Sequence, residues 1–186
     1  MSCFKQARRS RQRGQALVEF SLVSILVFTL MFGIMDWSYF FSGKVSATNA
    51  ARSAARYAAV HPTAWTNANP PAANTIESRL ILTAVPATVV NQDYASGAKS
   101  YITISYLIPS TAGGTACGQY SVSANGFVGD PISGGGTYTQ AQCVVAGNIV
   151  TVEAVYTYRF ITPFLQAAFS PGTIQITTVA AELIEV

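Results

Sequence analysis

A run of apolar residues near the amino terminus constrains this chain more than any other feature of its sequence. Residues 15–35 are 21 consecutive positions whose only charged side chain is the carboxylate of Glu19. About 20 apolar residues suffice to cross the hydrocarbon core of a bilayer as an α-helix. An unpaired charge in hydrocarbon costs at least about 2.5–3.5 kcal/mol, so Glu19 requires a functional reason. The sequence therefore predicts a transmembrane helix that carries one acid.

Charged residues are distributed unevenly around this run. Residues 1–14 carry five Lys or Arg side chains and no acid, whereas the rest of the chain carries six basic and eight acidic residues. A basic segment that precedes a membrane helix stays in the cytoplasm. We therefore expect a cytoplasmic leader over 1–14, a transmembrane helix over 15–37 and an exported globular domain over 38–186. A basic arm that binds nucleic acid is disfavoured, because the apolar run follows directly.

Three other interpretations of the apolar run compete with this one. A cleaved secretory signal has an apolar region of only about 7–15 residues, and the small-residue site at 45–47 lies too far beyond the run. A buried core helix is disfavoured by the basic leader. An uncleaved signal anchor shares every feature except a need for Gly14 and Glu19, so it remains an alternative.

Helical periodicity continues beyond the apolar run, and no proline interrupts it before Pro62. Small residues recur on one face of this second half, at Ala47, Ala51, Ala54 and Ala58. We therefore expect one helix from Gln15 to Val60, bare in its first half and packed through these alanines in its second. The sheet on which it packs should be antiparallel, because the alternation of apolar and polar residues predicts strands over 101–107, 149–160 and 173–184.

Two local signals add detail to this α+β fold. Asn74 and Glu77 have the spacing of a capping box and predict one short extra helix over 75–83. Asn125-Gly126 is typical of a two-residue hairpin turn. Residues 108–147 are otherwise rich in Gly, Ser and Thr, which predicts an exposed excursion.

The sequence offers no catalytic, cofactor-binding or metal-binding set. His61 is the single histidine, and its position beside Pro62 favours a role at the end of the helix. The acids are scattered, and the glycine pairs lack the Lys-Ser/Thr of a phosphate-binding loop. We expect no enzymatic activity, no cofactor and no metal, and a secreted enzyme with an unrecognised site is the least favoured function.

Two blocks of sequence carry a resemblance to a known family. The first is Arg13-Gly-Gln-Ala-Leu-Val-Glu-Phe20, followed by the apolar span with Gly33-Ile-Met-Asp-Trp37 and by the alanine-rich residues 49–60. This combination resembles the TadE-like pseudopilins of tight-adherence (Tad/Flp) type IV pilus systems. The second block, residues 150–160 and 174–185, is similar to the carboxyl-terminal part of longer members and is far less specific.

The resemblance implies a pilin-like fold and a minor pilin that helps to assemble, prime or regulate a Tad-type pilus. It implies that a prepilin peptidase cleaves between Gly14 and Gln15 and that Glu19 docks the subunit into the pilus. Phe20 stands where major Flp pilins often have Tyr, which fits a minor subunit. Gln15 replaces the Phe common in other type IV pilins, so methylation of the new amino terminus stays open.

The resemblance also implies a location and a set of partners. The chain would be a single-pass protein of the bacterial inner membrane, with a cytoplasmic amino terminus and a periplasmic globular domain, and it would stay there or enter the extracellular pilus. The implied partners are the prepilin peptidase, the major Flp-type pilin, other minor pilins, the inner-membrane assembly platform and the lipid bilayer. The alternative function is a membrane-anchored periplasmic binding module with an uncleaved signal anchor.

Cleavage after Gly14 would also change the number of cysteines. It removes Cys3 and leaves Cys117 and Cys143. A disulfide between these two closes a loop of about 27 residues and suits an oxidising compartment, with two free buried thiols as the alternative. The bond would hold the 108–147 excursion. In an unprocessed chain we expect the leader to be extended or poorly ordered.

Overall fold

The computed structural model describes residues 3–66, 68, 72–83, 102–109, 114–121, 126–169 and 172–185. The chain divides into two compact units. The N-terminal unit comprises residues 1–39 and 160–172, and the sheet unit comprises residues 40–159 and 173–186. Each unit is described by itself below.

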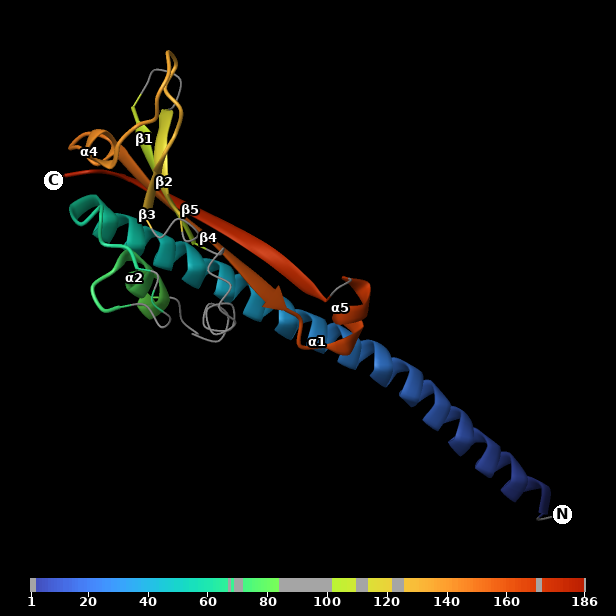
Figure 1. Cartoon of the computed structure of the whole chain (residues 1–186). Helices are drawn as coiled ribbons and strands as arrows, with labels where there is room; N and C mark the ends of the chain where they lie inside the picture. Colours follow the sequence, from blue (N-terminus) through green and yellow to red (C-terminus); the bar gives the residue numbers. More distant parts are fainter. Residues whose placement is uncertain are drawn as a thin grey trace. The chain divides into compact units, whose positions relative to one another are not determined.

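Helix α1 (Cys3–Val60) is the longest element of the chain (Figure 1). Its end at Val60 is as predicted, and the His61 N–H donates to the carbonyl oxygen of Tyr57 at 2.9 Å before Pro62 stops the helix. Its start differs from the prediction, because the helix begins at Cys3 and includes the leader. The expectation of an extended or poorly ordered leader is therefore wrong. The leader is rich in Arg and Gln, which are good helix formers, and it contains no proline, so nothing in it ends the helix.

Within the described residues, five strands form one antiparallel sheet in the order β3-β2-β1-β4-β5 (Figure 1). The strands are β1 (Ile102–Ile108), β2 (Thr115–Ser121), β3 (Gly126–Gly129), β4 (Ile149–Arg159) and β5 (Thr173–Leu183). Three of them lie within one residue of the strands that the alternating pattern predicted. The long pair β4 and β5 is antiparallel, with Ile149 opposite Leu183 and Arg159 opposite Thr173. The predicted α+β fold is confirmed.

Strands β2 and β3 form the predicted hairpin, but its turn was placed wrongly. Gly126 pairs with Ser121 as a residue of β3, so the connection is 122–125, which lies outside the described residues. In this register Gly118 lies opposite Gly129. A Cβ added to Gly129 would collide with the carbonyl oxygen of Tyr138. A side chain at position 129 would therefore force this packing to shift.

Helix α2 (Ile76–Thr83) matches the predicted short helix, but its cap lies one residue later than expected. The Thr75 N–H donates to Ser78 Oγ at 3.1 Å, and the Ser78 N–H donates to Thr75 Oγ1 at 3.3 Å. Asn74 instead adopts a φ of 60° in the preceding turn. The Glu77 carboxylate accepts the N–H of Thr66 at 3.1 Å. Two further helices, α4 (Gln140–Cys143) and α5 (Pro163–Ala168), were not predicted.

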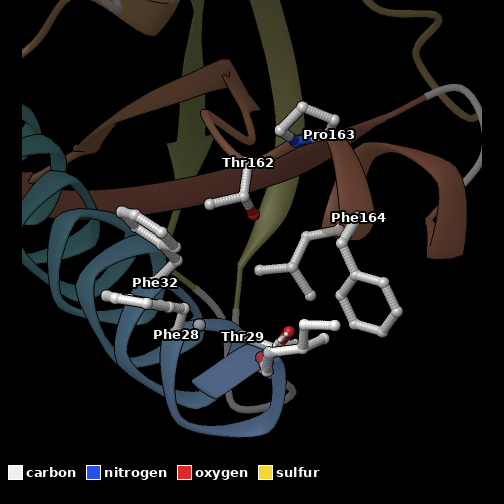
Figure 2. Close-up of a pocket in the computed structure, with 9 residues that line it drawn as sticks. Phe28, Thr29, Phe32, Thr162, Pro163 and Phe164 are labelled. Carbon is white, nitrogen blue, oxygen red and sulfur yellow. Dashed lines mark hydrogen bonds between the residues drawn. The ribbon is translucent and has the colours of Figure 1, made fainter. Parts of the chain in front are cut away.

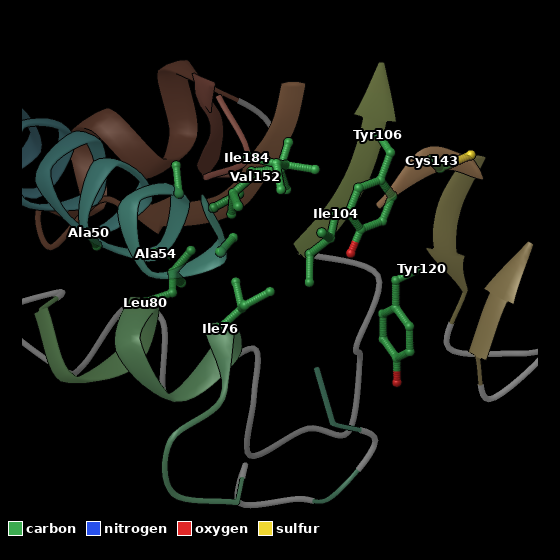
Figure 3. Close-up of a cluster of buried hydrophobic side chains, with 14 of the residues drawn as sticks. Ala50, Ala54, Ile76, Leu80, Ile104, Tyr106, Tyr120, Cys143, Val152 and Ile184 are labelled. Carbon is green, nitrogen blue, oxygen red and sulfur yellow. The ribbon is translucent and has the colours of Figure 1, made fainter. Parts of the chain in front are cut away.

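The core of the sheet unit lies between the second half of α1, helix α2 and one face of the sheet (Figure 3). All four predicted alanines of α1 are buried: Ala47, Ala51, Ala54 and Ala58. Ala54 and Ala58 belong to the same buried cluster as the fully buried Ile104, Val150 and Val152 of the sheet. Alanine lets a helix approach a sheet closely while still removing apolar surface from water. At the end of the chain, the Glu185 N–H donates to the carbonyl oxygen of Ala59 at 3.0 Å.

Candidate functional site

The first half of α1 presents a large apolar surface. Leu17, Phe20 and Leu26 are each about two thirds exposed or more, and the apolar side chains around them are exposed as well. An 18-residue window has a mean hydropathy of 2.3, and none of it is buried. Soluble monomers rarely expose continuous apolar patches larger than a few hundred Å². By length and composition this helix can cross a membrane.

The residues predicted for processing and assembly all lie on this exposed stretch. Gly14, Gln15, Glu19 and Phe20 are helical and exposed. Among the described residues, apart from its chain neighbours and the backbone of its own helix, no atom lies within 4 Å of the position that a Cβ on Gly14 would occupy. Among the described residues, none forms an ion pair with Glu19. The structure thus leaves the peptide bond after Gly14 and the carboxylate of Glu19 open to other molecules, and their roles stay predictions.

Sequence reasoning missed Asp36, the acid at the end of the apolar run. Asp36 is only 1% exposed. Its carboxylate accepts the N–H groups of Ile161 and Thr162, both at 3.0 Å, and the hydroxyl of Thr162. Thr162 is the N-cap residue of α5, and Pro163 follows it at the first helical position. Asp36 therefore supplies from α1 the negative charge and the acceptors that a helix N-terminus requires.

A weak signal for part of this arrangement exists in the sequence. Thr162-Pro163 is typical of a helix start, since Thr caps well and Pro is favoured at the first position. The local sequence could not link Asp36 to this helix start, because Ile161 and Thr162 lie 125 and 126 residues after Asp36.

Residues 160–169, which we call the α5 segment, are held by several further contacts in the N-terminal unit. The Phe160 ring stacks on Phe169 with centroids 5.1 Å apart and meets the edge of Trp37 at 6.4 Å. The side-chain amide of Gln166 donates to the carbonyl oxygen of Phe160 at 2.6 Å. Ile161 and Phe164 nevertheless remain about 65% exposed. The segment is thus tied to its neighbours and apolar on its outer surface.

A groove of about 360 Å³ separates the α5 segment from α1. Its α1 side consists of Ile25, Phe28, Thr29, Phe32 and Gly33, and its other side consists of residues 162–165. Figure 2 shows the rings of Phe28 and Phe32 on one side and Phe164 on the other. The lining is almost entirely apolar, so the groove suits hydrocarbon and not a polar ligand.

The sheet unit contains the two exported cysteines. Cys117 of β2 and Cys143 of α4 are both fully buried and are joined by a disulfide, with their Cα atoms 5.6 Å apart. The bond lies inside the region predicted to be an exposed excursion. That region instead contributes β2 and β3 to the sheet, so it is part of the folded unit.

Buried tyrosines lie beside Glu77 in the same unit. Tyr106 donates its hydroxyl to the carbonyl oxygen of Pro62. Burial raises the pKa of Tyr106 well above its ordinary value, and the nearby Glu77 carboxylate raises it further. The pKa of Tyr120 is raised by the same two causes in the same order. These tyrosines therefore remain neutral and act as part of the core.

No group of three or more His, Cys, Asp or Glu side chains is placed to hold a metal ion within the part of the chain that the structure describes. His61 stacks on the ring of Tyr57, with centroids 4.6 Å apart, at the end of α1. The structure thus gives His61 a packing contact. The prediction that the chain is not an enzyme stays a prediction.

Comparison with known families bears on most of α1. A family model described as TadE-like protein matches residues 14–56. Residues 14–56 are a TadE-like segment. The match begins at the predicted processing site, includes Glu19 and Asp36, and ends in the buried half of α1. No curated protein and no solved structure matches the chain. The resemblance drawn from the sequence is confirmed for this segment.

Proposed function

We propose that this chain is a minor pilin-like subunit of a tight-adherence type IV pilus, held in the bacterial inner membrane by α1. The observation that carries the proposal is the exposed apolar half of α1 within a TadE-like match. This surface requires a nonpolar environment, which lipid supplies before assembly and other pilin helices supply after it. The basic leader stays in the cytoplasm and the sheet unit is periplasmic, where the Cys117–Cys143 disulfide is stable.

Processing takes place between Gly14 and Gln15 and is carried out by the prepilin peptidase. Gly14 is exposed, and among the described residues a Cβ added to it would meet no atom within 4 Å apart from its chain neighbours and the backbone of its own helix. Glycine inside a helix costs about 1 kcal/mol relative to alanine, so the helix opens more easily at this residue than elsewhere in the leader. Cleavage removes the five basic residues of the leader and creates a new ammonium group on Gln15.

Glu19 docks the processed subunit. Its carboxylate lies one helical turn after Gln15, about 6 Å along the axis. In a bundle of such helices, a shift of one turn between neighbours brings the carboxylate of one subunit beside the ammonium group of the next. The pair removes the cost of an isolated charge in hydrocarbon and fixes the axial register of the subunits. The partners are the major Flp-type pilin, other minor pilins and the inner-membrane assembly platform.

The test compares Glu19→Ala and Glu19→Gln with Ser21→Ala, a control change in the same span. The hydroxyl of Ser21 donates to the carbonyl oxygen of Val18 within its own helix, so its loss should not affect a neighbour. All three variants should remain in the membrane after alkaline extraction, because none adds a charge to the span. Both Glu19 variants should lose co-purification with the pilins by about tenfold or more, which corresponds to about 1.4 kcal/mol.

Two results would contradict the proposal. Full co-purification by Glu19→Ala would show that the carboxylate does not dock the subunit. Release of the wild-type chain by alkaline extraction would show that α1 is not a membrane anchor.

A further inference from the structure

The α5 segment carries a second apolar surface that the proposed function does not use. Ile161, Phe164 and Phe169 are 66%, 65% and 40% exposed. Residues 160–169 contain no charged side chain. The segment and the first half of α1 belong to the same compact unit, so their arrangement is described directly by the structure.

The groove places the α5 segment beside the apolar run. Its α1 side extends from Ile25 to Gly33, about 12 Å along the helix at 1.5 Å per residue. The segment is tied to α1 at Asp36, which directly follows the apolar run. Trp37, a residue type enriched at membrane–water interfaces, comes next and contacts Phe160. The groove therefore lies along the half of the span that is farther from the leader.

The backbone of the segment is suited to a nonpolar environment. A chain segment enters hydrocarbon only if its polar backbone groups have partners. The Asp36 carboxylate accepts the N–H groups of Ile161 and Thr162, and Pro163 has no N–H to satisfy. Two further hydrogen bonds lie within the segment, from Gln166 N–H to Thr162 O and from Phe169 N–H to Leu165 O, and a third joins Phe160 N–H to the carbonyl oxygen of Gly172 just after it.

We propose that the α5 segment enters the outer leaflet of the bilayer as a second membrane contact, with a phospholipid acyl chain in the groove between Phe28, Phe32 and Phe164. The inference rests on the membrane anchoring by α1 that the proposed function includes. A second helix is the less suitable occupant. Helices that associate in membranes approach each other through small residues, whereas the bulky rings of Phe28, Phe32 and Phe164 line this groove. A flexible hydrocarbon chain can fill the space that is present.

The contact has a consequence for the subunit. A helix alone can rotate about its axis and shift in depth, whereas a second insertion point on one side fixes both. The Asp36 carboxylate is the positioning group, because it joins the segment to the end of the span. The α5 segment must also leave the lipid when the subunit is withdrawn into a filament.

The experiment uses nitroxide labels on the full chain in vesicles of phosphatidylethanolamine and phosphatidylglycerol. Cys117 and Cys143 are joined and do not react, so Cys3→Ser supplies a background without a free thiol. Labels are attached at Phe164→Cys, at Phe28→Cys as the reporter of the span, and at Val145→Cys as an exposed control in the sheet unit. Collision of each label with oxygen, which is enriched in lipid, is compared with collision with a water-soluble nickel chelate.

The labels at 164 and 28 should collide at least about fivefold more with oxygen than with nickel, relative to the label at 145. A label at 164 that behaves like the one at 145 while the label at 28 is in lipid would overturn the inference and leave the anchor intact. A water-exposed label at 28 would overturn both. The label at 164 could instead be shielded from both oxygen and nickel, and become accessible only when the protein is diluted in lipid. This result would show that a protein helix fills the groove, and it would also overturn the inference.

Discussion

The replacement of Asp36 by alanine should release the α5 segment without unfolding the sheet unit. The Asp36 carboxylate accepts two backbone N–H groups and one hydroxyl, all from residues 161 and 162. None of these residues belongs to the core cluster of the sheet unit. We therefore expect a local opening of residues 160–169 and an unchanged core.

The magnitude follows from these hydrogen bonds. Each bond to a charged group contributes about 1.5–3 kcal/mol, which gives roughly 4.5–9 kcal/mol for the three together. Burial of a carboxylate that is 1% exposed offsets several kcal/mol of this sum. We therefore expect the free energy of opening of the α5 segment to fall by about 2–3 kcal/mol. The segment should then open about 30- to 140-fold more often.

Hydrogen exchange measures this opening directly. In lipid nanodiscs, the amides of Ile161 and Thr162 should exchange about 30- to 140-fold faster in Asp36→Ala than in the wild type. Asp36→Asn keeps one carbonyl oxygen as an acceptor, so its effect should be smaller. Amides of β4, such as that of Val152, should exchange at the wild-type rate in both variants.

Glu182→Ala is the matched control for the loss of a carboxylate. Glu182 is partly exposed, and its carboxylate forms a surface ion pair of 3.8 Å with Arg56, which contributes about 0.5 kcal/mol or less. Glu182→Ala should leave the exchange rates of the Ile161 and Thr162 amides unchanged. The reasoning is refuted if Asp36→Ala leaves these amides protected, or if it accelerates exchange equally throughout β4.

Two predictions concern the sheet unit. Replacement of Cys117 and Cys143 together by serine should lower the free energy of unfolding by about 3.5 kcal/mol in urea titrations, because the bond closes a loop with a sequence separation of 26; an unchanged midpoint would contradict a formed disulfide. The folded state raises the pKa of Tyr106 above its ordinary value of 10.0, so the stability that Tyr106 contributes is complete below about pH 10 and is lost as the pH rises further. Tyr106→Phe should reduce this alkaline loss, with the remainder due to Tyr120, whose pKa is raised in the same direction; an identical pH dependence in the variant would contradict the assignment.

The features that sequence predicted well are those in which burial follows a period. The alanines at 47, 51, 54 and 58 recur on one helix face, and all of them are buried. The alternation along 149–160 and 173–184 predicted β4 and β5 to within one residue at each end. Such patterns predict structure because one face of a helix or strand packs against the core and the other face does not.

The features that sequence did not predict depend on contacts between distant residues or on competing local signals. Thr75 and Ser78 cap α2, although Asn74 and Glu77 have an equally suitable spacing, and the Glu77 carboxylate accepts the N–H of Thr66, which lies 11 residues away. The leader continues the helix since no residue in it ends one. Asp36 could not be linked to Thr162 from sequence, because no periodicity relates residues this far apart.

In the candidate site, too, some residues could be predicted from the sequence and others could not. Glu19 stands out because a charge inside an apolar run is unusual whatever the fold. Asp36 lies at the edge of the run, where an acid is unremarkable, and only its burial reveals that it is structural. The exposed apolar surface of the α5 segment likewise depends on which face of a short helix packs, and six residues are too few to show a period.

Processing after Gly14 is tested most directly by the amino-terminal sequence and the intact mass of the protein from its native membrane. The chain should begin at Gln15 in cells with the complete secretion system. Gly14→Leu should leave the precursor intact, whereas Gly33→Leu, at a second glycine of α1 with no atom within 4 Å of an added Cβ, should be processed normally. A native protein that begins at Met1 in those cells would contradict the account and establish an uncleaved signal anchor in its place.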